Sequence, residues 1–264
     1  MGNLTLNLLN STVCSKVLRC LLLLATVLIS TRIISASEVR IVESAGIYYE
    51  LTDGAFSSAQ QKFAGTAKVV CPQNDPSLTY NITTAIIPQF VTDPAGAKYL
   101  VTDISEAAFY NCVSLKTVSI PANVTQIEYN AFLYCRNIVT FRIERSTTPL
   151  IIGKQIFDGQ RLDKHDSYAP LNFYIGRPLS VSGDASLLCQ TNTVKCEIEG
   201  VTHLTSEYIT GCRSLKELTL YTGLESVDNI SGCASLTYLE IPEGVVRLGT
   251  QAPDGGLQLS LIHI

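Results

Sequence analysis

A short phrase of apolar and small residues recurs along most of this chain. Its clearest copy is Ile104–Pro121 (ISEAAFYNCVSLKTVSIP), which ends in three apolar positions spaced as L-x-x-φ-x-φ, where φ is apolar. Copies of that ending recur at a period of about 23 residues. They are Leu115/Val118/Ile120, Ile138/Phe141/Ile143, Pro170/Phe173/Ile175, Thr193/Cys196/Ile198, Leu215/Leu218/Leu220, Leu236/Leu239/Ile241 and Leu259/Ile262/Ile264. This period predicts a solenoid in which each turn adds one short strand to a parallel sheet and neighbouring turns share one core.

Other positions of the phrase also recur, at a fixed distance before each predicted strand. An aliphatic residue stands five positions before an aromatic or apolar one, and a cysteine stands three positions after it. The first pairs are Ile104/Phe109, Ile127/Phe132, Ile152/Phe157 and Leu204/Ile209, and the cysteines are Cys112, Cys135, Cys212 and Cys233. Two further copies read ITGCRSLKELTL and SGCASLTYLEIP.

This complete phrase resembles the BspA-like class of leucine-rich repeats over roughly residues 46–264, most closely at 99–143 and 209–264. The resemblance implies an α/β-type leucine-rich-repeat solenoid. Its parallel sheet of short strands would line the concave face, and loops or short helical turns would form the convex face. The longest interval between copies places an inserted polar loop at Asp163–Tyr168.

The chain divides into three expected parts. Residues 1–37 form a signal peptide, 38–98 an N-terminal β cap with a degenerate first repeat, and 99–264 a solenoid of about seven repeats with an incomplete C-terminus. Ile47–Leu51 and Ala67–Cys71 are the expected strands of the cap, because the first turn of a solenoid needs its apolar end covered. Since the last copy stops at Ile264 without a cap, we expect a fragment of a longer protein or a truncated gene copy.

The first residues have the pattern of a secretory signal. Lys16 and Arg19 precede an apolar run, Cys20–Ile29, and small residues around Ala36 and Ser37 offer a cleavage zone. An uncleaved signal anchor is the alternative, but the run has about ten residues where a spanning helix needs about twenty. We therefore expect an extracellular or cell-surface protein that meets a membrane only through this signal or a missing anchor.

Composition and motifs argue against several classes of function. A formal charge of -4 leaves no basic patch for nucleic-acid phosphates. Glycine-rich phosphate loops, H-E-x-x-H, G-x-S-x-G and C-x-x-C are all absent, so we expect no catalysis, no metal and no cofactor. His165 stands beside two aspartates, but such loops are usually just solvated; His203 is expected on a surface turn.

Nine cysteines invite a disulfide interpretation. Two of them, Cys14 and Cys20, fall inside the predicted signal, which leaves an odd number that cannot all pair within one molecule. The cysteines that share the repeat position should lie in a column, with neighbours about 5 Å apart, a distance that permits a disulfide. Buried apolar thiols are the favoured interpretation, because the pattern follows the repeat.

The candidate binding face consists of the residues between the inward positions of each strand, which should point outward. They are Thr117, Ser119, Thr140, Arg142, Asn172, Tyr174, Lys195, Glu197, Glu217, Thr219, Tyr238 and Glu240. By resemblance, the expected partner is a host, matrix or cell-surface protein bound in adhesion. A ligand-recognising receptor ectodomain whose anchor or signalling part is missing is one alternative. A second is a set of repeats that target a hydrolase encoded further on.

Sequons for N-glycosylation begin at Asn81, Asn123 and Asn229. They would be used only if the source is a secreting eukaryote, and sequences this short often arise by chance.

Overall fold

The computed structural model describes residues 39–54, 63–157, 168–182, 186–228 and 230–249. The chain separates into two units, 1–39 and 40–264, and every described strand belongs to the second. The predicted signal peptide, Asp163–Ser167 of the predicted insertion and the copy at Leu259/Ile262/Ile264 lie outside the described residues.

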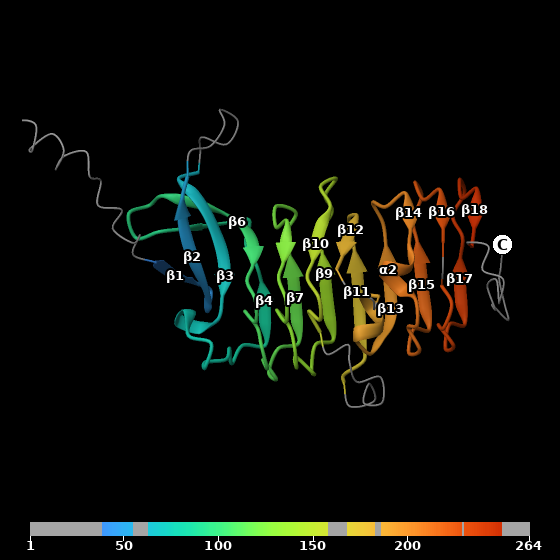
Figure 1. Cartoon of the computed structure of the whole chain (residues 1–264), viewed down its shortest axis with the longest axis horizontal. Helices are drawn as coiled ribbons and strands as arrows, with labels where there is room; N and C mark the ends of the chain where they lie inside the picture. Colours follow the sequence, from blue (N-terminus) through green and yellow to red (C-terminus); the bar gives the residue numbers. More distant parts are fainter. Residues whose placement is uncertain (1–38, 55–62, 158–167, 183–185, 229, 250–264) are drawn as a thin grey trace, which may run out of the picture. The chain divides into compact units, whose positions relative to one another are not determined.

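One sheet contains a strand from each successive turn, and we call it the repeat sheet. Its seven strands are paired in chain order, and every pairing is parallel (Figure 1). They are β4 (Thr84–Ile86), β7 (Thr117–Ile120), β9 (Thr140–Ile143), β11 (Leu171–Ile175), β13 (Thr193–Ile198), β15 (Glu217–Leu220) and β17 (Tyr238–Glu240). The prediction of a parallel sheet with one short strand per turn is therefore confirmed.

The inward positions of this sheet stack on one another in register. Val118 pairs with Phe141, Phe141 with Phe173, and the row continues through Cys196 to Leu218. All five side chains are buried. Alternation along each strand sends these residues into the core and their neighbours outward.

One predicted inward position is wrong. Pro170 is exposed, and Leu171 is buried in its place. Leu171 pairs with the buried Thr193, whereas the next residue, Asn172, pairs with Lys195. The register therefore shifts by one residue at a β-bulge, which brings a leucine to the core and leaves the proline, which has no N–H to donate, outside the strand.

A second sheet is formed by further short strands of the turns. Its parallel repeat strands are β6 (Lys98–Ile104), β8 (Gln126–Ile127), β10 (Leu150–Ile152) and β12 (Leu179–Val181). A third sheet is built in the same way, from short parallel strands of successive turns. Its strands are β14 (His203–Leu204), β16 (Ser226–Val227) and β18 (Arg247–Leu248). Helical turns also occur, at η1 (Pro72–Asn74), η3 (Leu188–Gln190) and α2 (Ser206–Ile209). Most neighbouring turns thus pair at two places, whereas, among the described strands, the turns that carry β12 and β14 pair only through the repeat sheet.

The aliphatic position of the repeat phrase belongs to these shorter strands. Ile104, Ile127, Ile152 and Leu204 are all completely buried at strand ends. The sequence showed the position but not its strand, because two or three paired residues are too few to display an alternation of period two.

Tight turns then bring the chain to the cysteine position. The residue before each repeat cysteine has a left-handed backbone, with φ of 56° at Asn111, 64° at Tyr134, 77° at Gly211 and 75° at Gly232. A Cβ at Gly232 would lie only 2.9 Å from the Cα of Gly211, so consecutive turns touch at this point through their backbones. Glycine and asparagine suit this conformation, and Tyr134 is the strained member of the series.

Aromatic rings fill the core between the two faces of the turns. The rings of Phe109 and Phe132 are parallel within 5° at a centroid distance of 5.0 Å, and Phe132 lies 5.9 Å from Phe157. Phe141 and Phe173, which come from the repeat sheet, pack at 4.9 Å from each other. The predicted aromatic position therefore forms a continuous ladder through these turns of the solenoid.

The N-terminal strands extend the second sheet beyond β6. β1 (Arg40–Ser44), β2 (Ile47–Asp53) and β3 (Gly65–Val70) form antiparallel pairs, and β3 then joins β6 in parallel. β5 (Phe90–Thr92) forms a hairpin with β6. Both predicted strands of the cap are present, and β1 is an additional strand. Their role as a cap stays a prediction.

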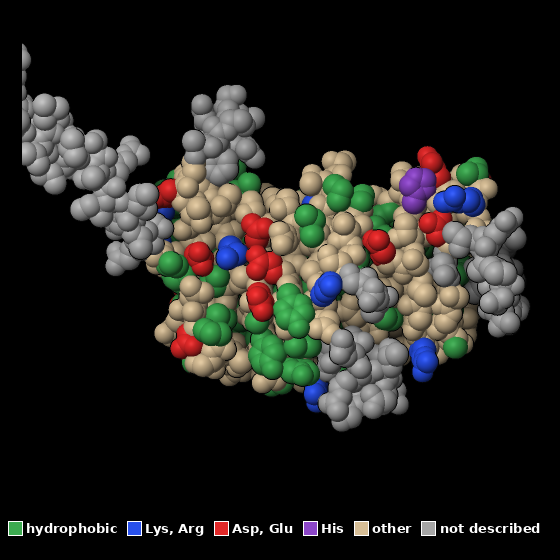
Figure 2. All heavy atoms as spheres, in the orientation of Figure 1, with side chains coloured by type: hydrophobic (Ala, Val, Ile, Leu, Met, Phe, Trp, Pro, Cys, Tyr) green, Lys and Arg blue, Asp and Glu red, His purple; other side chains and the backbone are tan. Residues whose placement is uncertain are grey.

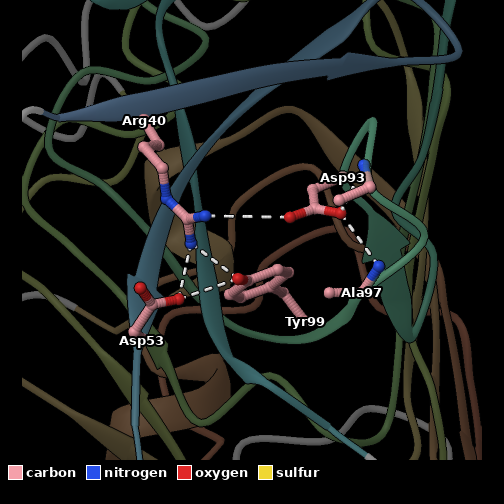
Figure 3. Close-up of polar contacts among 6 residues, drawn as sticks. Arg40, Asp53, Asp93, Ala97 and Tyr99 are labelled. Carbon is pink, nitrogen blue, oxygen red and sulfur yellow. Dashed lines mark hydrogen bonds and ion pairs between the residues drawn. The ribbon is translucent and has the colours of Figure 1, made fainter.

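A charged cluster fastens β1 to this N-terminal region (Figure 3). The Arg40 guanidinium lies 2.5 Å from Asp53 and 2.6 Å from the hydroxyl of Tyr99, and 3.7 Å from Asp93. Tyr99 also donates to Asp53 at 2.7 Å, and Asp93 accepts the backbone N–H of Ala97. The hydrogen bond with Tyr99, helped by the two aspartates, raises the pKa of Arg40.

Replacing Leu115 by Asp should destabilise the repeat core. Leu115 has no exposed surface, so the variant would bury a carboxylate in a continuous apolar stack and lose about 4 kcal/mol or more. Val113→Asp is the matched control, because Val113 lies in the same turn and is 51% exposed. Urea unfolding measures both, and an unchanged midpoint for Leu115→Asp would show that Leu115 is not an inward position of the repeat.

Replacing Arg40 by Met should loosen the N-terminal strands without affecting the repeats. Amide hydrogen exchange should become faster in β1 and the end of β2, because the ion pairs that hold them are lost, and added salt should reduce the difference. Lys68→Met, on the neighbouring strand β3, controls for the loss of a cation. Equal protection of β1 in the parent and in Arg40→Met would show that the cluster does not hold the strand.

Candidate functional site

The outward residues of the repeat sheet form two rows that cross the strands. The strand pairings align Thr117 with Thr140 and Ser119 with Arg142, and the same register continues through later turns. All twelve predicted residues lie in these rows and are exposed or half-exposed. The first row is Thr84, Thr117, Thr140, Asn172, Lys195, Glu217 and Tyr238; the second is Ile86, Ser119, Arg142, Tyr174, Glu197, Thr219 and Glu240.

The middle of this face carries an arginine–tyrosine cluster. The Arg142 guanidinium carbon lies 3.7 Å from the ring centre of Tyr174, a cation–π contact. Arg145 donates to the Tyr174 hydroxyl at 3.3 Å and forms an ion pair with Glu199 at 2.5 Å. Two arginines of the preceding turn thus contact Tyr174 and restrict its orientation, which lowers the entropy that a partner's binding would cost.

The later turns carry carboxylates and tyrosines. Tyr221 donates to Glu197 at 3.0 Å, and Tyr238 donates to Glu240 at the same distance. Lys195 lies 3.4 Å from Glu197 and 3.9 Å from Glu217. This end of the face is therefore acidic, with one lysine among the carboxylates.

The same contacts shift the acid–base behaviour of the face. The hydrogen bond to Glu197 raises the pKa of Tyr221, and that to Glu240 raises the pKa of Tyr238. The hydrogen bond and ion pair with Glu199 raise the pKa of Arg145. Tyrosine and arginine are already protonated at neutral pH, and these contacts extend that state to higher pH.

The first turns present a different chemistry. Thr84, Thr117, Thr140 and Ser119 supply hydroxyls, and Ile86 is 63% exposed beside them. The face therefore changes along the solenoid from neutral hydroxyl groups, through an arginine–tyrosine centre, to an acidic end.

Several contributors to the face were missed from the sequence. Thr84 and Ile86 belong to the degenerate first repeat and align with the two rows. Arg145, Glu199 and Tyr221 follow the last inward position of their strands, where alternation no longer assigns a direction. The signal that could have found them is the identity of the first two residues after L-x-x-φ-x-φ, compared between turns.

Other surface features of the described residues present apolar and aromatic groups. Figure 2 shows hydrophobic side chains gathered at one place on the face in view, with acidic side chains next to them. On the turns, the rings of Tyr110 and Tyr134 meet at 5.5 Å, and Arg136 lies over Tyr134 at 5.6 Å. An open cleft of about 580 Å³ near β5 is lined by Phe63, Phe90 and Lys98 among others.

A serine and a histidine meet at 3.0 Å on the third sheet, between Ser226 Oγ and Nδ1 of His203. Asp228 lies 3.4 Å from the serine and forms an ion pair with Arg247, so the carboxylate orients the serine and not the histidine. A hydrolytic triad needs the opposite order. Within the described ranges, His, Cys, Asp and Glu nowhere gather in a group of three that could hold a metal.

The sequons differ in their surroundings. Asn81 is exposed and its side-chain oxygen accepts a hydrogen bond from Ser114 at 2.8 Å. The amide nitrogen of Asn123, which would carry a glycan, instead donates to the backbone oxygens of Gln89 and Val101. Asn229 lies outside the described residues.

Expression in a glycosylating eukaryotic host should therefore give a folded protein that carries a glycan at Asn81 and none at Asn123. A glycan on Asn123 would replace one of the two amide hydrogens that donate to Gln89 and Val101, so at least one of these hydrogen bonds would be lost. Glycopeptide mass spectrometry measures occupancy, with Asn81→Gln and Asn123→Gln as paired variants. Full occupancy of Asn123 in folded protein would contradict this expectation.

No helix among the residues described has both the length and the apolar character needed to cross a bilayer. This observation concerns helices alone.

Solved structures of leucine-rich repeat proteins resemble the chain at low sequence identity. A leucine-rich repeat protein from Bacteroides capillosus is 21% identical, with 69% of this chain and 98% of that chain covered and a TM-score of 0.40. A leucine rich cell surface protein from Faecalibacterium prausnitzii is 21% identical over 82% of this chain and 52% of its own, with a TM-score of 0.37. The T. pallidum leucine rich repeat protein is 19% identical over 75% of this chain and 91% of its own, with a TM-score of 0.36.

No curated protein matches the chain. The model of the BspA type leucine rich repeat region, by contrast, matches residues 97–171 and 182–259 in 6 copies. These two ranges contain the strands β7, β9, β15 and β17 of the repeat sheet and the four cysteine-bearing turns. Because they make up more than half of the sequence, the chain belongs to the BspA type leucine rich repeat family.

Proposed function

We propose that this protein is secreted or displayed at the cell surface and binds a host, matrix or cell-surface protein through the outward face of the repeat sheet. Membership of a repeat family built for protein contacts supports this function. The secretory pattern of the first residues supports the location. Binding on this surface requires no catalysis.

The observation that carries the proposal is the fixed Arg142–Tyr174 pair at the centre of the two rows. Arginine and tyrosine are enriched among the residues that dominate interface energies, and such residues cluster near interface centres. Both side chains are outside the core, and Arg145, itself paired with Glu199, holds the tyrosine from the side. A side chain that is ordered before binding loses less entropy on association.

The proposed face suits a partner with polar and charged groups more than an apolar one. Hydroxyls, carboxylates, a lysine and tyrosine hydroxyls supply directional hydrogen bonds along the two rows. Differences between turns, rather than the repeated core, would then set specificity.

The double variant Arg142→Ala/Tyr174→Ala should weaken binding to intact host cells and immobilised matrix proteins by at least about tenfold. The matched control is Arg136→Ala/Tyr134→Ala, which removes another stacked arginine and tyrosine, on the turns. The control should bind as the parent does. Binding of each purified protein is measured by surface plasmon resonance and by flow cytometry.

Two outcomes would overturn the proposal. One is a parent protein that binds none of these targets above a variant with a scrambled face. The other is an equal loss of binding in both double variants, which would assign contact to the turns or to a global loss of structure. Circular dichroism and thermal melting of each variant separate these explanations.

A further inference from the structure

The repeat places cysteine thiols against one another in two pairs, Cys112 with Cys135 and Cys212 with Cys233. Each pair occupies the same position of consecutive turns, and each cysteine follows a residue with a left-handed backbone. All four are thiols in the structure.

The two pairs repeat the same geometry although they lie in different parts of the solenoid. The Cys135 thiol donates to the backbone oxygen of Phe109 at 2.9 Å, and the Cys233 thiol donates to that of Ile209 at 3.1 Å. Phe109 and Ile209 hold the equivalent position, three residues before Cys112 and Cys212. The later thiol of each pair therefore leans toward the turn that carries the earlier one.

This orientation of the later thiol favours a disulfide bond, because two stacked turns are slightly too far apart for one. Stacked turns separate equivalent atoms by about 4.8 Å, whereas Cβ atoms in a disulfide lie about 3.8 Å apart. The side chains must close a gap of about 1 Å, and the contact of the later thiol with the backbone of the preceding turn brings that side chain toward its partner. The short backbone contact between Gly211 and Gly232 draws the second pair of turns together.

The other described cysteines have different surroundings. Cys196 lies in the inward row between Phe173 and Leu218, away from the thiol column. The Cys189 thiol donates to the backbone oxygen of Ser186 at 3.1 Å, and the Ser186 hydroxyl lies 3.9 Å from the sulfur of Cys212 on that side. Cys71 follows β3 and is half-buried.

We propose that Cys112–Cys135 and Cys212–Cys233 are sites of disulfide formation, and that each bond links two consecutive turns of the solenoid. The oxidant is a disulfide such as oxidised glutathione. One cysteine thiolate attacks a glutathione sulfur, which breaks the glutathione S–S bond and releases one glutathione thiolate. The partner thiolate then attacks the mixed disulfide and releases the second. The cysteines lose two electrons and two protons, and glutathione is reduced to two thiols.

The second pair should react first in the folded protein. Cys233 is partly exposed, whereas Cys112 and Cys135 are both buried. The neighbouring thiol lowers the pKa of Cys233 and, in the same way, that of Cys112, so exposure is what distinguishes the two pairs. A reagent in water can reach the sulfur of Cys233 directly, but the first pair needs local opening or oxidation during folding.

The full chain is incubated folded in a glutathione redox buffer, quenched in acid, alkylated after denaturation and digested without reduction. Mass spectrometry should find peptides that join residue 112 to 135 and residue 212 to 233, with Cys71, Cys189 and Cys196 alkylated. The second link should form faster. The oxidised protein should melt roughly 5–10 °C above the reduced one, because each bond constrains the unfolded chain.

Variants distinguish these links from chance pairing. Cys135→Ser should leave Cys112 alkylated and the second link intact, and Cys71→Ser should leave both links in place. Protein oxidised in urea should give a mixture of pairings. The proposal fails if the folded chain keeps all four thiols in the redox buffer, or if Cys212 pairs with Cys189. Neither result depends on whether the repeat sheet binds a partner.

Discussion

Each turn of this protein buries its apolar side chains against the same positions of the next turn, and the rest of the structure depends on that stacking. The parallel rings of Phe109 and Phe132 show the contact most directly, and the row from Val118 to Leu218 repeats it on the sheet. A single turn has no other surface on which to bury these groups. The inward row is therefore filled by buried apolar side chains, while the outward positions differ between turns in charge and polarity.

Stacking in register also decides which polar and reactive groups meet. A residue of one turn lies beside its counterpart in the next turn, so the repeat turns a single cysteine position into a column of thiols. The same rule brings Arg142 beside Tyr174, although one belongs to β9 and the other to β11. The scaffold thus creates neighbours between turns without any motif that is local in sequence.

The second and third sheets and the repeat sheet contribute differently to the structure. The short strands of the second and third sheets and the left-handed residues before the cysteines give each turn its path, and Tyr134 accepts a strained backbone there. The repeat sheet leaves two rows of side chains open to solvent. Its change from hydroxyl groups to an arginine–tyrosine centre and then to carboxylates gives the proposed binding face a direction along the solenoid.

The sequence by itself determined the period, the inward positions and the outward rows, because alternation and the spacing of apolar residues are local properties of the chain. Only the tertiary structure decided the second sheet, whose strands are too short to show a period, and the bulge that puts Leu171 in place of Pro170. It also decided that Arg145 meets Glu199 and that the Asn123 amide is occupied. These contacts join different turns, and their partners depend on how the turns stack.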